Sequence, residues 1–97
     1  MKYRFYLNQN PFTTINGYKP GDPLKFAYEG EVEPNAWPTM ADQLFQTFNL
    51  DRPADYHDRS MSVGDIVVFY SVKTSTVLAC QLTGWTKLPH HHLNIQA

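Results

Sequence analysis

The stretch that decides the fold is Ile66-Val67-Val68-Phe69-Tyr70, because consecutive apolar residues of this kind imply a strand that is covered on both faces. It is preceded by Ser60-Met61-Ser62-Val63-Gly64-Asp65. The Gly64-Asp65 pair predicts a tight turn in which glycine takes a positive φ and the aspartate caps free amides. We therefore expect a central strand over 66–70 that is entered through this turn.

Further strands are predicted on both sides of the central one. Residues 76–82 are β-branched and apolar enough to return antiparallel beside it, and residues 85–88 add a last short strand. Upstream, apolar and polar residues alternate over 2–7 and again over 24–29, as in strands with one buried and one solvent-exposed face. These segments predict a sheet of four to six short strands.

One short helix is predicted over 40–49. Thr39-Met40-Ala41-Asp42 has the form of a capping box at a helix start. The apolar stripe of this helix consists of Met40, Leu44, Phe45 and Phe48. An isolated helix of about ten residues is marginal in water, so the stripe must lie against the sheet. A second local signal, Asn16-Gly17, is typical of a very small hairpin.

The fold class that follows is α+β, with a curved, mainly antiparallel sheet and one short helix packed on it; a partly open small barrel is the alternative. The chain of 97 residues predicts a single domain over 1–97, with 89–97 as a candidate flexible tail. Hydrophobic residues make up 42% and aromatic residues 14%, which separates the chain from disordered proteins. A net charge of -1 excludes the strongly basic surface on which many nucleic-acid binders depend. The lone Cys80 cannot form an internal disulfide, and we expect a cytoplasmic protein with a reduced thiol.

Several polar groups have both a structural and a functional interpretation. Arg59, Ser60 and Ser62 can form an anion-binding nest, although the tight turn at Gly64 is the favoured interpretation. Cys80 lies in an apolar strand, which favours core packing over a nucleophile. His90-His91-His92 can bind divalent metals, but a solvated tail is favoured.

Acidic residues and one histidine follow the predicted helix, at Asp51, Asp55, His57 and Asp58. Carboxylates and imidazole are ligand types for metals and groups for acid and base catalysis. Pro53 interrupts the regular helix that would align them. We therefore expect caps and salt partners of Arg52 and Arg59 instead.

A resemblance rests on three segments: Phe48-Asn49-Leu50-Asp51-Arg52-Pro53-Ala54-Asp55-Tyr56, Arg59-Ser60-Met61-Ser62-Val63-Gly64-Asp65-Ile66-Val67-Val68, and Cys80 with Gly84-Trp85. In their order and spacing, residues 45–85 resemble the YodL-like family, with Met61 where the family usually has Leu. The family occurs on phages, plasmids and integrative conjugative elements. The resemblance implies an accessory protein of a mobile element.

The aromatic content suggests what such a protein does, because six Phe, six Tyr and two Trp exceed what so small a core needs. Tyr and Trp are enriched at protein interfaces. The leading hypothesis is a non-enzymatic module that binds a protein partner, since no catalytic set can be assembled from the sequence and no cofactor or metal is expected. The alternative is a small nucleic-acid or nucleotide-binding barrel of PUA-like architecture, in which Trp85 or Tyr56 stacks on a base. The candidate binding residues of the two hypotheses are Arg52, Tyr56, Arg59, Ser60, Ser62, Trp85 and Lys87.

Overall fold

The computed structural model describes residues 1–89 and 92–96. Its elements, in chain order, are β1 (Lys2–Asn8), α1 (Thr13–Asn16), β2 (Pro23–Glu31), α2 (Trp37–Leu50), β3 (Ile66–Tyr70), β4 (Ser75–Gln81), β5 (Gly84–Lys87) and β6 (Asn94–Gln96).

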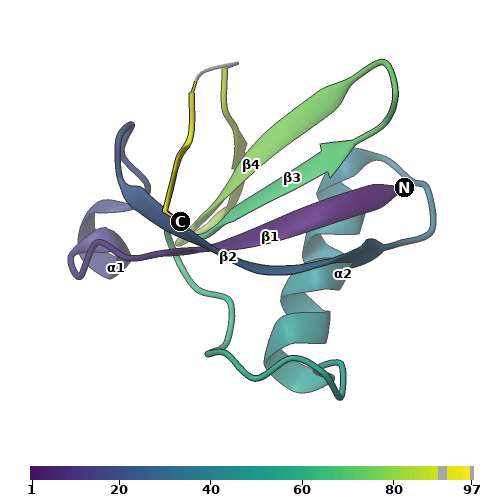
Figure 1. Cartoon of the computed structure of the whole chain (residues 1–97), viewed down its shortest axis with the longest axis horizontal. Helices are drawn as coiled ribbons and strands as arrows, with labels where there is room; N and C mark the ends of the chain where they lie inside the picture. The colour runs from purple at the N-terminus through teal and green to yellow at the C-terminus, as the bar shows by residue number, and fades with distance from the viewer. Residues whose placement is uncertain (90–91, 97) are drawn as a thin grey trace.

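The strands form one open sheet in the order β5-β4-β3-β1-β2-β6. All neighbours are antiparallel except β2 and β6, which run parallel. Figure 1 shows α2 against one face of this sheet, passing behind β1 and β2. The predicted α+β class with a mainly antiparallel sheet is confirmed, and the sheet is open, not closed into a barrel.

The central strand is β3, as predicted, and it contributes to a hydrophobic cluster on each face of the sheet. The inner face, which α2 covers, buries Val67 and Phe69 with Leu44 and Phe48 of the helix. The outer face buries Ile66, and the segment around Leu93 packs against that side. Alternate side chains of a strand point to opposite faces, so a continuous apolar run supplies both clusters.

The helix differs from its prediction at its start. It begins at Trp37, three residues before the predicted start, with Ala36 as N-cap and no capping side chain. The capping-box prediction at Thr39 is therefore wrong. Pro38 lies in the first helical turn, where the missing N–H has no helical acceptor to lose.

Two other segments also differ from expectation. The hairpin predicted at Asn16-Gly17 is wrong: Thr13–Asn16 is a single helical turn, and Gly17 follows it with φ 72°. At the end of the chain, Asn94–Gln96 of the predicted tail pairs with β2 as strand β6. Among the residues that the structure describes, no helix is long and apolar enough to cross a membrane.

Candidate functional site

Asp65 is the centre of a polar cluster at the entrance to β3. Its side chain is 0% exposed, and Arg59 donates to it with two parallel bonds of 2.8 Å, from Nη1 to Oδ2 and from Nη2 to Oδ1. This bidentate geometry is the strongest common form of a charged hydrogen bond in proteins. The bonds to Asp65 raise the pKa of the Arg59 guanidinium above its ordinary value. The positive charge of Arg59 is therefore compensated within the chain.

Backbone amides complete the environment of the Asp65 carboxylate. The N–H of Asn8 donates to Oδ1 and the N–H of Ser62 donates to Oδ2, each at 2.8 Å. The predicted turn is confirmed, with Gly64 at φ 93° and Asp65 capping the amide of Ser62. The amide and guanidinium donors that an anion-binding nest would use are directed at this carboxylate, so the nest holds an anion of the chain itself.

The cluster continues through Asn8 into the loop that follows β1. The Asn8 Nδ2 group donates to Asp22 Oδ2 at 3.0 Å and to the Gly64 carbonyl at 2.9 Å. Asp22 also accepts from Asn10 Nδ2 at 2.9 Å and from the Lys19 N–H at 3.0 Å. Burial alone would raise the pKa of Asp22, but these hydrogen bonds hold it below its ordinary value. The network therefore ties the loop of residues 9–22 to the start of β3.

Five of the predicted binding residues lie together in the segment that leads to this cluster. Arg52 Nη2 donates to Ser60 Oγ at 2.6 Å, and Arg59 Nη1 donates to Ser62 Oγ at 3.2 Å. Tyr56 donates its hydroxyl to the Arg59 carbonyl at 2.5 Å.

Tyr56 is buried in the inner cluster, where its ring centroid lies 4.9 Å from that of Phe48. Burial, followed by the nearby charges of Asp58 and Asp65, raises the pKa of Tyr56 to about 12. The faces of its ring are packed against the core and do not offer a stacking platform for a base.

The acidic residues after α2 have partners other than those predicted. Asp55 accepts the hydroxyl of Tyr28 at 2.8 Å, and Asp58 pairs with Lys25 at 3.1 Å. Both contacts are with β2, so the predicted pairing of these carboxylates with Arg52 and Arg59 is wrong; Arg52 reaches the backbone carbonyl of Asp58, not its carboxylate. Sequence reasoning failed here because β2 lies about 30 residues away along the chain.

Cys80 is buried as predicted, at the end of β4. Burial, together with the charge of Asp65, raises the pKa of its thiol to about 12. A thiol of this kind holds its proton at neutral pH and is a poor nucleophile. Of the histidine tract, His90 and His91 lie outside the described residues, so the metal-binding interpretation is not placed on the structure.

Trp85 and Lys87, the other two predicted binding residues, lie on β5. No hydrogen bond or ion pair between described side chains links either of them to the Arg59 cluster. Trp85 is half-buried against the inner cluster and lines a hollow of about 220 Å³. We call this hollow the β5 groove; its lining residues are Asp42, Phe45, Gln81, Leu82, Gly84 and Trp85.

The β5 groove exposes two large apolar side chains that are not among the binding residues predicted from the sequence. Phe45 is 42% exposed and Leu82 is 85% exposed. Phe45 falls within the predicted helical stripe, but the buried stripe consists of Met40, Ala41, Leu44 and Phe48 instead. The helix is thus turned so that Phe45 lies beside the β4–β5 turn, a placement that periodicity alone does not give.

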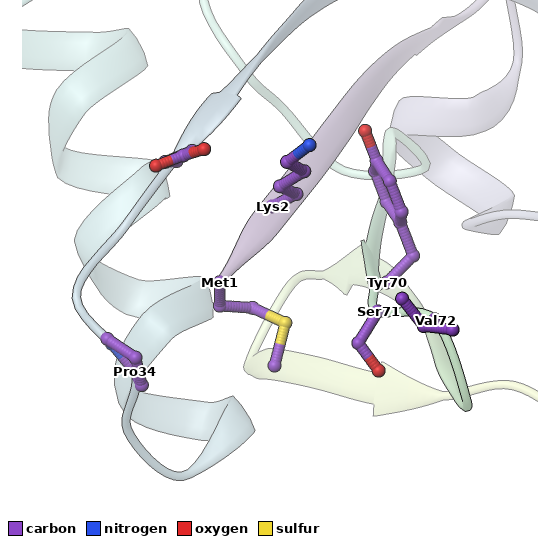
Figure 2. Close-up of a pocket in the computed structure, with 7 residues that line it drawn as sticks. Met1, Lys2, Pro34, Tyr70, Ser71 and Val72 are labelled. Carbon is purple, nitrogen blue, oxygen red and sulfur yellow. The ribbon is translucent and has the colours of Figure 1, made fainter.

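A larger hollow lies elsewhere, at the end of the sheet where β1 begins. It measures about 610 Å³ and is lined by Met1, Lys2, Glu31, Pro34, Tyr70, Ser71 and Val72. Figure 2 shows Lys2 beside Tyr70 on the neighbouring strand, with the Met1 side chain directed toward Ser71. Lys2 and Glu31 are exposed cross-strand neighbours, so two opposite charges line this hollow. Charged residues are depleted and aromatic residues enriched at the centres of protein interfaces. The smaller β5 groove has one charged lining residue, Asp42, and two aromatic ones, Phe45 and Trp85, which makes it the better candidate.

Comparisons with known proteins give one result. Neither the curated proteins nor the solved structures contain a match to this chain. A family match, described as YodL-like domain, extends over residues 2–90, nearly the whole chain and well beyond the segment in which the sequence motifs lie. The chain belongs to the YodL-like domain family.

Proposed function

We propose that this YodL-like domain is a non-enzymatic protein-interaction module that binds its protein partner through the β5 groove. The observation that carries the proposal is the exposure of Phe45 and Leu82 in the hollow that Trp85 also lines. Aromatic and large apolar side chains around a hollow are the groups that dominate binding energy at protein interfaces. Burying such groups against a partner is favourable, at roughly 25 cal/mol per Å² of apolar surface removed from water.

The chemistry of the other candidate groups supports a non-enzymatic role. The Cys80 thiol is protonated and buried, and the Arg59 guanidinium is paired with the Asp65 carboxylate. The Arg59–Asp65 pair holds the segment between α2 and β3 in place. In this proposal Arg52, Tyr56, Arg59, Ser60 and Ser62 are the scaffold, while Trp85 and Lys87 face the partner.

The resemblance of the sequence motifs to proteins of phages, plasmids and conjugative elements supports a mobile-element origin. On this proposal the gene lies among genes of such an element, and the partner is a protein of the element or of its host. Sequencing the flanking genes tests the origin directly: integration, transfer or phage structural genes are expected, and a housekeeping operon would contradict it.

Affinity capture tests the proposed function. The tagged chain is expected to retain a stoichiometric protein from a lysate of cells that carry the gene. The matched variant Phe45→Ser with Leu82→Ser removes two exposed side chains and is expected to fold normally, because neither is part of the buried core. Loss of the captured protein with this variant supports the proposal, and equal capture by both chains would contradict it.

A further inference from the structure

The outer edge of β5 carries backbone hydrogen-bonding groups that no described strand pairs, and this edge lies beside the groove. β5 pairs with β4 on one side and has no strand on the other among the described residues. The Leu88 N–H donates to the Val77 carbonyl at 2.8 Å, and the register places Lys87 opposite Leu78. Backbone groups alternate in direction along an antiparallel strand. The N–H and C=O groups of Trp85 and Lys87 therefore point away from β4, toward the open edge.

The side chains of the same two residues lie on the inner face of the sheet. Trp85 is opposite Cys80 and Lys87 is opposite Leu78, which belongs to the inner cluster. Trp85 lines the β5 groove, while Lys87 is exposed and forms no ion pair with any described residue. The edge thus presents, two positions apart, an aromatic side chain and a positive charge that no described carboxylate compensates.

Resting on the proposed function, we infer that an extended segment of the partner protein adds to the sheet as a strand antiparallel to β5. The backbone of that segment bonds to Trp85 and Lys87. One of its apolar side chains enters the β5 groove beside Trp85, and an acidic side chain lies opposite Lys87. Strand addition at a sheet edge uses main-chain bonds for affinity and alternate side chains for specificity.

The charge and length of β5 restrict which strand can add. Lysine on an edge strand opposes pairing with generic apolar segments, and the following Pro89 has no N–H to extend the edge. An acidic residue opposite Lys87 would instead form an attractive cross-strand pair with the lysine, so the charge of Lys87 favours an acidic strand. In an antiparallel arrangement the partner sequence reads acidic, any residue, apolar.

Two synthetic peptides test this inference on the full chain. The probe is Thr-Thr-Glu-Thr-Leu-Thr-Thr with blocked ends, and the matched control has Lys in place of Glu. The measurement is an NMR titration with amide hydrogen exchange. The Glu peptide is expected to slow exchange of the Trp85 and Lys87 amides and to bind about five-fold more tightly than the Lys peptide. In the variant Lys87→Glu this preference is expected to reverse.

The variant Lys87→Pro removes one outward N–H without removing a bond to β4, and it is expected to weaken binding about five-fold. The exchange data on the unmodified chain do not depend on the folding of this variant. Unprotected Trp85 and Lys87 amides, or an unchanged preference in Lys87→Glu, would overturn strand addition. Such a result, with capture still lost in the Phe45 and Leu82 variant, would leave the proposed function standing. If the Phe45 and Leu82 variant captures the partner as well as the unmodified chain does, the proposed function itself is contradicted.

Discussion

At the scale of single residues, the polar groups of this chain act mainly on one another. Asp65 receives two bonds from Arg59 and one each from two backbone amides. A buried carboxylate is tolerated only when it is paired and hydrogen-bonded, and here both conditions hold. The turn at Gly64-Asp65 was predictable because its signal is local. The bond from the Asn8 amide was not, since the two residues are 57 positions apart in the chain.

The close approach of Thr13 to the backbone of Gly64 leads to a first prediction of stability, because it leaves no room for a side chain at position 64. A Cβ atom at position 64 would lie 1.5 Å from Thr13 Oγ1, and φ is 93°. Gly64→Ala is therefore expected to destabilise the fold by about 3 kcal/mol, from overpacking together with left-handed strain. Urea denaturation measures the change.

Gly21→Ala is the matched control for Gly64→Ala. Gly21 has nearly the same φ, 92°, but a Cβ atom at position 21 would have no atom within 4 Å. The substitution should cost only the backbone strain, about 1 kcal/mol. Equal losses for the two variants would show that the close approach of Thr13 contributes nothing.

Asp22 gives a prediction of pH dependence. Its pKa in the folded protein is lowered, so the folded state favours the carboxylate. The stabilisation is complete above the ordinary value of 3.8 and is lost as the pH falls through the lower folded value. Asp22→Asn should therefore be less stable than the unmodified chain at neutral pH, and the difference should shrink in acid. Urea midpoints of both chains across this range test it, and a difference that stays constant with pH would contradict it.

At the scale of elements, strands with a clear local pattern were predictable. The alternation in β1 and β2 and the apolar run in β3 gave these strands nearly their observed bounds. β6 was missed because its three residues carry no pattern and become a strand only by pairing with β2. The rotation of α2 about its own axis also differs from the prediction, since Ala41 is buried and Phe45 is exposed. Packing against the inner face of the sheet decides that rotation, and the helix sequence alone does not specify it.

One prediction at the start of α2 distinguishes the capping box predicted from the sequence from the helix start seen in the structure. A capping Thr39 would cost about 1 kcal/mol on substitution by alanine. In the structure Thr39 lies inside the helix and is exposed. Thr39→Ala should then raise stability by about 0.5 kcal/mol, because alanine is the better helix former. Thermal denaturation measures this, beside Leu44→Ala, which removes a buried side chain and should cost about 3 kcal/mol. A loss of stability in Thr39→Ala would contradict this and would indicate that Thr39 caps the helix.

At the scale of the whole molecule, strands from near both ends of the chain lie in one sheet. The radius of gyration is 12.4 Å, close to the roughly 13 Å expected for a compact domain of this length. The Arg59–Asp65 cluster joins β1 to the segment between α2 and β3, and none of its residues lines the β5 groove. The family assignment was within reach of the sequence motifs. The sequence did not indicate which predicted binding residues belong to the Arg59–Asp65 cluster and which to the β5 groove, because that depends on which residues the fold brings together.

The central claim is that the partner binds at the β5 groove and not at the segment that carries Arg52 and Arg59. Isothermal titration calorimetry of the captured partner against two surface variants tests it most directly. Leu82→Ser is expected to weaken binding by about ten-fold or more, whereas Arg52→Ala leaves the affinity unchanged. Binding that survives Leu82→Ser and is lost in Arg52→Ala would contradict the account.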